Sequence, residues 1–181
     1  MTRGEVLMAG IGGMGVLVAG QLLSRAAFKR HEHASYIPSY GFVRRGGNSE
    51  YTVIFSDERI SSPLLDQAQT VVLLDSSQFE AYESRVRLRG LLIVEKSGLT
   101  AERQRKDYEF HVLPAMEMAV GMGTSVLVGL IMLGACIEIT RLIAPNLIED
   151  EIRIRYADDD KLLIRNVEAF RRGLKLGEGV T

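Results

Sequence analysis

The sequence predicts an α/β fold with a mostly parallel sheet that helices cover on both faces. Two observations lead to this prediction. Short runs rich in Val, Leu and Ile alternate with helical patterns over the first two thirds of the chain, and several of these runs are continuously apolar, as in strands buried on both faces. The last third is helical. We treat residues 1–181 as one domain, long enough to bury roughly 70% of its unfolded surface.

The first element is an apolar strand over 5–9, followed by a glycine loop and an amphipathic helix over 16–28. A strand, a glycine turn and a helix in this order are typical of the phosphate-binding loop of Rossmann-like folds. We expect the first glycine to permit a sharp exit from the strand, the second to admit a phosphate, and the last to let the helix pack closely on the strand. Close packing without a ligand explains the pattern equally well. The loop glycines are Gly10, Gly12, Gly13 and Gly15.

The second strand is expected near 34–37, and its end decides which ligand the loop suits. A dinucleotide fold normally places Asp or Glu there to hold the ribose hydroxyls. In this chain Pro38 follows, and Glu32 precedes the strand. The residues that come next are basic and glycine-rich: Arg44, Arg45, Gly46 and Gly47. An NAD site is therefore disfavoured, whereas arginine leaves an NADP site open.

Further strands are predicted over 49–55, 70–74, 90–94 and 108–113, with a helix that begins at Gln78. The C-terminal helices are expected over 126–140, 146–155 and 161–174.

Residues 118–137 carry no charge, which raises the question of a membrane span. The apolar helix expected over 126–140 is, however, too short to span a bilayer comfortably. We interpret it as a buried helix, with an apolar face kept for another subunit as an alternative.

The motifs in the first half resemble the gamma subunit of the 2-oxoacid:ferredoxin oxidoreductases. In that family a G-x-G-G-x-G loop is followed by R-G-G, a strand and S-P. Here Arg45-Gly46-Gly47 and Ser62-Pro63 stand in those places, and later segments such as Leu113-Pro114-Ala115 also fit. The resemblance covers nearly the whole chain. It departs from the family at Ile11 and Met14, where glutamine is commoner.

The resemblance implies a subunit of an enzyme that decarboxylates a 2-oxoacid on thiamine diphosphate, passes electrons through iron–sulfur clusters to ferredoxin, and transfers the acyl group to coenzyme A. The thiamine diphosphate, its magnesium and the clusters are expected on alpha, beta and ferredoxin-like partner subunits. This chain has no Gly-Asp-Gly motif and a single cysteine, Cys136, whereas each cluster needs several. The chain itself is expected to be inactive alone and to serve assembly and coenzyme A binding.

Composition excludes several function classes. The formal net charge is −1, with acids and bases interspersed, so neither nucleic-acid binding nor a membrane-surface role is implied. One cysteine excludes an intrachain disulfide framework and suits a reducing cytoplasm. Cys136 is interpreted as a buried structural thiol, and no metal site or catalytic residue is assigned. His31 and His33 are interpreted as a solvated turn, and Asp158–Asp160 as a helix start.

Three interpretations follow. The first is a gamma subunit whose candidate ligand-binding residues are Gly10, Gly12, Gly13, Gly15, Arg44, Arg45, Gly46 and Gly47. The second is a stand-alone NADP-binding oxidoreductase, and the third is a nucleotide-sensing module without chemistry. For the first, overall resemblance favours 2-oxoglutarate as the oxoacid. Self-association through an apolar patch is an open alternative when partner subunits are missing.

Overall fold

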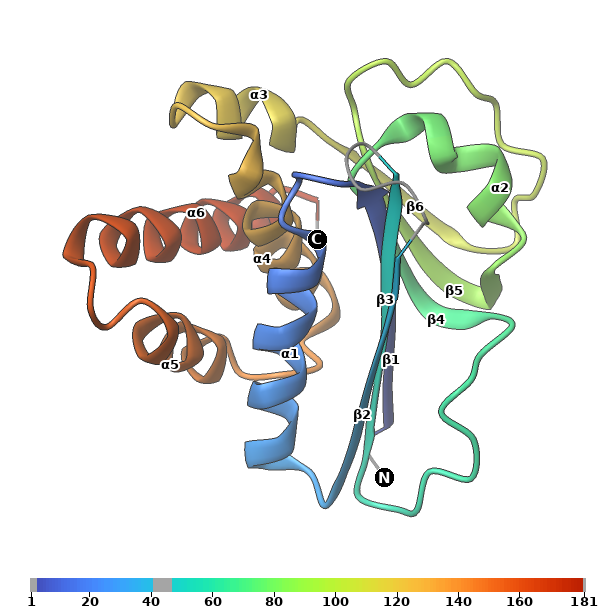
Figure 1. Ribbon diagram of the computed structural model, residues 1–181. Helices are drawn as coiled ribbons and strands as arrows, with labels where there is room; N and C mark the ends of the chain where they lie inside the picture. The colour runs from blue at the N-terminus through green and yellow to red at the C-terminus, as the bar shows by residue number, and fades with distance from the viewer. Residues whose placement is uncertain (1–2, 41–46, 181) are drawn as a thin grey trace.

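The computed structural model describes residues 3–40 and 47–180. Within these residues a six-stranded sheet has the strand order β2-β3-β1-β4-β5-β6 (Figure 1). The α/β fold predicted from the sequence is confirmed. The strands are β1 Arg3–Ile11, β2 His33–Tyr40, β3 Asn48–Ser56, β4 Ala68–Leu73, β5 Val86–Glu95 and β6 Glu109–Leu113.

One strand departs from the parallel arrangement. β1, β4, β5 and β6 pair in parallel, whereas β3 is antiparallel to both of its neighbours, β1 and β2. β3 follows β2 through a short connection, and a short connection can only join antiparallel strands. The sheet is therefore mixed, with β3 inserted between the two strands that the glycine-loop helix connects.

The helices divide unequally between the two faces of the sheet. α1, α4, α5 and α6 lie on one face, α2 lies on the other, and α3 stands near the carboxyl ends of the parallel strands (Figure 1). The prediction of helices on both faces and of a helical C-terminal third is confirmed. The helices are α1 Val16–Arg30, α2 Phe79–Glu83, α3 Ala115–Gly121, α4 Val128–Thr140, α5 Pro145–Arg155 and α6 Asp160–Glu178, with short 3-10 turns η1 Ser76–Gln78 and η2 Ser125–Leu127.

The face covered by α1 and α4 holds the larger apolar core. Every residue of α4 from Val128 to Ile137 is buried. Glycines let α6 lie directly on α4: a Cβ added to Gly134 would come within 2.3 Å of the Phe170 carbonyl oxygen, and one added to Gly173 within 2.1 Å of the Ile131 carbonyl oxygen. The buried-helix interpretation is correct. α6 of the same chain packs on α4, so the residues from Val128 to Ile137 keep no exposed face for another subunit, whereas Val126 at the start of the predicted helix is exposed.

The opposite face has a smaller core, built around Phe79 of α2 and the inward side chains of β1, β4 and β5. Buried carboxylates supplement it. Glu83 is 4% exposed and accepts hydrogen bonds from the backbone N–H groups of Gln104 and Arg105 and from the Tyr108 hydroxyl. The loop that follows β5 is thus held to α2 by a charge.

The carboxylate of Glu83 titrates below its ordinary range. Burial raises the pKa of Glu83, but the hydrogen bonds from Tyr108, Arg105 and Gln104 together outweigh burial, so the pKa is lowered. The ionised form is therefore the one that holds the loop.

Two sequence interpretations of polar residues have opposite outcomes. Asp159 caps α6 by accepting the N–H of Leu162 at 3.0 Å, as predicted for the acidic helix start. His31 is not a solvated turn residue: it is 6% exposed, its Nδ1 lies 2.8 Å from Asp57 Oδ1, and its ring stacks on Phe55.

Among the described helices, none combines the length and the hydropathy needed to cross a bilayer.

Candidate functional site

The sheet has a topological switch point between β1 and β4. The chain leaves β1 toward α1 on one face, and it leaves the neighbouring parallel strand β4 toward α2 on the other face (Figure 1). Ligands of open α/β sheets bind outside the carboxyl ends of the strands at such a point. The glycine loop follows β1 directly, so the candidate site lies where the fold itself favours one.

The first loop glycine is part of β1 rather than an exit from it. Gly10 pairs with Ser49 of β3, and the strand continues to Ile11. A Cβ on Gly10 would come within 2.9 Å of the Leu74 Cβ and of the Val16 side chain. The absence of a side chain is required here by packing between the end of β4 and the start of α1, and the predicted sharp turn lies further on.

The second loop glycine is linked to the segment that precedes β3. The Gly12 N–H donates to the Gly47 carbonyl oxygen at 3.0 Å. The structure therefore brings together two predicted site residues that are far apart in sequence. The same hydrogen bond occupies the N–H of Gly12, so this N–H is not free to meet a phosphate.

The third and fourth loop glycines adopt positive φ angles, 100° for Gly13 and 75° for Gly15. Gly13 is exposed and a Cβ on it would meet nothing within 4 Å. Gly15 is enclosed: its Cβ would come within 2.5 Å of the Val126 carbonyl oxygen. The expectation that Gly15 packs the helix on the strand is wrong, because its close neighbours are η2 and the start of α4.

The N-terminus of α1 has no side-chain cap. Gly15 is its N-cap and has no side chain to cap the first turn. The N–H groups of that turn have no partner within the helix, and they favour negative charge. A hollow of about 190 Å³ lies beside them, lined by Ile11, Gly12, Gly13, Gly15, Val16, Leu17, Val18 and Ser49. Pockets that enclose a whole ligand usually measure about 300–1,000 Å³, so this hollow suits a single phosphate group.

The other half of the predicted site lies mostly outside the described residues. Arg44, Arg45 and Gly46 are not among them, and Gly47 is the first residue after that gap. What the structure does place is the end of this segment, through the bond between Gly47 and Gly12.

The segment after β4, which the sequence did not indicate as a site, contacts the first loop glycine. Gln78 is 6% exposed and its Nε2 lies 3.5 Å from the Gly10 carbonyl oxygen. Asp75 caps η1 by accepting the N–H of Ser77 at 2.9 Å. Gln78 lies at the end of η1 and not directly after β4, so no local pattern in the sequence identified it.

The described residues do not provide the ribose partner of a dinucleotide. The strand beside β1 on the α1 side is β3, which runs antiparallel and presents Asn48 and Ser49 next to the glycine loop. β2, whose end normally carries the acidic residue, is one strand further away. The arrangement thus separates the glycine loop from the position that recognises NAD in Rossmann folds.

No redox or metal chemistry can be assigned to the described part of the chain. Cys136 is fully buried in α4, and burial raises the pKa of its thiol to about 12. A buried neutral thiol is a poor nucleophile, and a single cysteine cannot supply the several thiolates that a cluster needs. Residues 3–40 and 47–180 contain no group of three or more His, Cys, Asp or Glu side chains placed to hold a metal ion.

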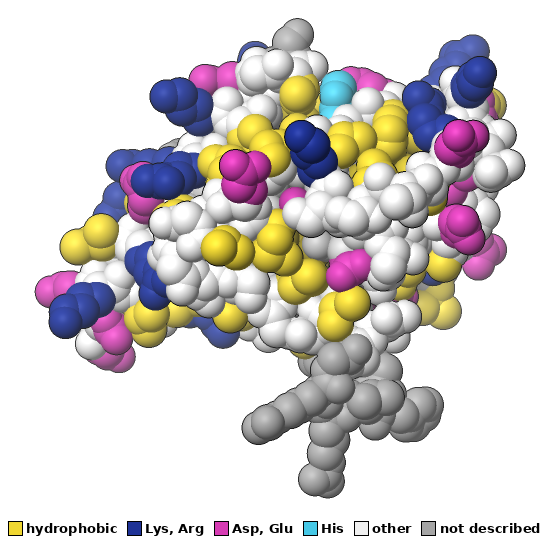
Figure 2. Space-filling model, turned by 90° about the horizontal axis from the view of Figure 1, so that it is seen from above, with side chains coloured by type: hydrophobic (Ala, Val, Ile, Leu, Met, Phe, Trp, Pro, Cys, Tyr) yellow, Lys and Arg dark blue, Asp and Glu magenta, His cyan; other side chains and the backbone are white. Residues whose placement is uncertain are grey.

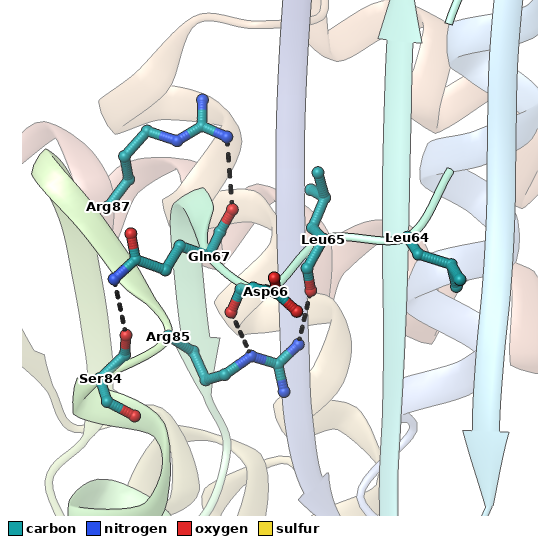
Figure 3. A pocket seen from close by; sticks show the side chains of 7 residues that line it. All are labelled: Leu64, Leu65, Asp66, Gln67, Ser84, Arg85 and Arg87. Atoms are coloured by element: carbon teal, nitrogen blue, oxygen red, sulfur yellow. Dashed lines mark hydrogen bonds between the residues drawn. The ribbon is translucent and has the colours of Figure 1, made fainter. Parts of the chain in front are cut away.

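A wider hollow lies at the opposite end of the sheet, near the starts of β4 and β5. It measures about 800 Å³, and its polar groups satisfy one another (Figure 3). Arg85 donates to the carbonyl oxygens of Leu65 and Asp66, and Gln67 donates to that of Ser84. These bonds hold the connection between β3 and β4 in place. Because this hollow lies away from the carboxyl ends of the strands, we do not assign it a ligand.

The surface above the carboxyl ends of the strands is partly apolar. Hydrophobic side chains lie there between charged ones (Figure 2). Exposed hydrophobic residues of elements near this edge include Val112 of β6, Val120 of α3 and Val126 of η2. The candidate site is therefore a glycine loop and a helix N-terminus beside an apolar surface.

Comparison with known proteins identifies relatives along nearly the whole chain. The ketoisovalerate oxidoreductase subunit VorA of Methanothermobacter marburgensis is 32% identical over 93% of this chain and 35% of its own length. The 2-oxoglutarate synthase subunit KorC of Archaeoglobus fulgidus is 30% identical over 98% of this chain and 89% of its own length. The pyruvate synthase subunit PorC of Methanothermobacter thermautotrophicus is 28% identical over 92% of both chains. The chain thus spans about a third of VorA but most of KorC and PorC.

Solved structures share the fold. The gamma subunit of a keto/oxoacid ferredoxin oxidoreductase from Geobacter sulfurreducens superposes with a TM-score of 0.82 at 22% identity, covering 99% of this chain and 98% of that one. A 2-oxoglutarate:ferredoxin oxidoreductase from Magnetococcus marinus gives 0.89 at 18% identity, covering 100% of this chain and 32% of that one. The model of the pyruvate ferredoxin/flavodoxin oxidoreductase family matches residues 5–176. The chain belongs to that family, as its resemblance to the gamma subunits predicted.

Proposed function

We propose that this chain is the gamma subunit of a 2-oxoacid:ferredoxin oxidoreductase complex. The observation that carries the proposal is the family match over residues 5–176, together with end-to-end relatives such as KorC and PorC. The proposed reaction is oxidative decarboxylation of a 2-oxoacid to its acyl-CoA. Thiamine diphosphate with magnesium, and the iron–sulfur clusters, would be held by alpha, beta and ferredoxin-like partner subunits in the cytoplasm.

The chain's own residues support an accessory role. The lone buried thiol of Cys136 does not fit a cluster, and the described side chains offer no metal site. We infer that the isolated chain oxidises no 2-oxoacid. Co-expression with thiamine-binding alpha and beta subunits is expected to give a stable complex that reduces ferredoxin or a viologen dye. Coenzyme A-dependent oxidation by the purified chain alone, with no co-purifying protein, would contradict the proposal.

The proposed substrate is 2-oxoglutarate. The KorC relative matches this chain over most of both lengths, whereas the more identical VorA relative contains the matched region as about a third of a longer chain. The PorC relative covers similar shares of both chains at 28% identity, against 30% for KorC. The assembled complex is expected to turn over 2-oxoglutarate with a higher kcat/KM than 2-ketoisovalerate or pyruvate. A higher value for either competitor would overturn this choice of substrate and leave the subunit role intact.

For coenzyme A, we propose that one of its phosphates meets the N-terminus of α1 at the glycine loop. The open space at Gly13, the uncapped first turn and the small hollow beside it support this. The Gly12→Val variant of the assembled complex is expected to bind coenzyme A at least about tenfold more weakly, because a side chain fills the approach to the loop. Gly121→Val, at an exposed glycine of α3 with open space around it, is the control. Calorimetry showing equal affinities would refute this site.

The same geometry predicts that the chain ignores NAD. Antiparallel β3 occupies the place of the strand whose end binds the ribose, so the ribose hydroxyls would lack their charged partner. Calorimetric titration of the purified chain with NAD is expected to show no binding at micromolar concentrations. Micromolar affinity for NAD would refute this expectation, and the same affinity for NADP would instead favour a role for Arg44 and Arg45 in reading a ribose phosphate.

A further inference from the structure

A buried carboxylate lies at the carboxyl edge of the sheet without touching the glycine loop. Glu95 is the last residue of β5 and is 1% exposed. A carboxylate in such a place is stable only when hydrogen-bonded. Its Oε2 accepts the N–H of Ser97 at 2.6 Å, and its Oε1 accepts the N–H of Met116 at 3.0 Å and the Ser97 hydroxyl at 3.2 Å.

The bond to Met116 makes Glu95 the N-terminal cap of α3. The residue that precedes α3 is Pro114, which provides no side-chain cap. The N–H groups of a first helical turn have no partner within the helix, and a carboxylate there also complements the helix dipole. The position of α3 is therefore set by a side chain from a strand of the sheet.

On one side, contacts from Glu95 lead to the first glycine of the loop. The carbonyl oxygen of Ser97 accepts a hydrogen bond from the Ser76 hydroxyl at 2.6 Å. Ser76 begins the η1 turn, and Gln78 ends it. Gln78 in turn contacts the Gly10 carbonyl oxygen. The carboxyl ends of β5, β4 and β1 are connected in this way.

On the other side, contacts from α3 lead to the last glycines of the loop. The N–H of Thr124 donates to the Ala119 carbonyl oxygen of α3 at 3.1 Å, and Thr124 caps η2. At the start of α4, the Gly129 N–H donates to the Met14 carbonyl oxygen at 2.9 Å. The two series of contacts, together with the glycine loop, form a closed ring around the carboxyl edge.

We propose that Glu95 is a positioning residue for the glycine loop, acting through this ring and not through contact with a ligand. Replacing its charge removes an acceptor from the N–H of either Ser97 or Met116, because a glutamine amide carries a single oxygen. When the single amide oxygen pairs with Ser97, α3 loses its cap, and the loop loses the support that Met14 receives from Gly129 of α4 and that Gly15 receives from η2. The effect of Glu95 on ligand binding rests on the proposed coenzyme A site, whereas the structural coupling between Glu95 and the glycine loop does not.

The coupling is tested by amide hydrogen exchange on the purified chain with Glu95→Gln. The exchange rate of the Gly129 amide is expected to rise at least about tenfold relative to the amides of β3, which serve as the reference for global unfolding. This is the size of effect expected from the loss of a hydrogen bond to a charged group. Glu83→Gln is the matched control, because it removes another buried carboxylate that holds backbone N–H groups outside the ring. Faster exchange at Met116 with no change at Gly129, or an equal effect in Glu83→Gln, would overturn the coupling.

The functional part is tested in the assembled complex. Glu95→Gln is expected to raise the KM for coenzyme A several-fold with kcat within about twofold of the wild type, whereas Glu83→Gln leaves both unchanged. A changed Gly129 exchange with an unchanged KM would overturn the role in positioning the site. A wild-type complex that does not use coenzyme A would contradict the proposed function, while the exchange result would still decide the coupling.

Discussion

The two faces of the sheet are stabilised in different ways. On the α1 face, helices approach one another through glycines, and α4 is enclosed between the sheet and α6. On the α2 face, a five-residue helix and long connections cover the sheet, and buried carboxylates such as Glu83 anchor them to backbone N–H groups. Apolar packing responds to volume and carboxylates respond to pH. The two faces should therefore fail under different perturbations.

The largest effect is expected from a volume change on the α1 face. In Gly173→Ala the added Cβ would lie 2.1 Å from the Ile131 carbonyl oxygen, so α6 must move away from α4. We expect the free energy of unfolding to fall by about 3 kcal/mol, the upper end of the usual cost of overpacking. Urea denaturation measures it. Gly121→Ala, where nothing lies within 4 Å, should cost little; equal losses in the two variants would contradict the proposed close packing.

A smaller effect is expected from a charge change on the α2 face. Glu83→Gln leaves at least one of the N–H donors of Gln104 and Arg105 without its charged acceptor. The expected loss is about 1.5–3 kcal/mol, the range for hydrogen bonds to a charged group. Amide exchange should speed up first in the loop before β6 and leave α4 unchanged. Uniform exchange across both faces would show that they unfold as one unit.

The comparison is sharpened by pH. Because the pKa of Glu83 is lowered from its ordinary value of 4.5, the stability it contributes is fully present above that value and is lost as pH falls through the lower folded value. The difference in Tm between wild type and Glu83→Gln should therefore be constant near neutral pH and shrink below about pH 4.5. Gly173→Ala should show a constant difference over the same range. A Glu83 difference that grows on acidification would reverse the assigned sign.

The smallest effect is expected at the end of α4. Arg141 has a φ of 52°, a left-handed conformation that favours glycine, and its ion pair with Glu138 is exposed. We expect Arg141→Gly to be neutral or to stabilise the chain by about 0.5 kcal/mol, because relief of backbone strain offsets the loss of a weak surface pair. Thermal unfolding would detect a rise in Tm. A clear fall would show that the ion pair contributes more than the strain costs.

The elements themselves were readable from local pattern. The apolar runs of β1, β4 and β5, the helix after the glycine loop and the cap at Asp159 depend on neighbours in sequence, so the sequence predicted them. The glycine loop was readable as a motif. Its partners were not: Gly15 meets Val126 and Gly12 meets Gly47, contacts between segments that local pattern does not relate.

The sequence by itself determined the α/β fold, the resemblance to the gamma subunits and the lack of a second cysteine for a cluster, because these depend on residue types and their local order. Only the tertiary structure decided that β3 is antiparallel, that α6 covers α4, and that Glu95 caps α3. Strand order, helix contacts and the partners of buried charges depend on which distant segments meet. That is fixed by the packing of the whole chain, so no window of the sequence contains it.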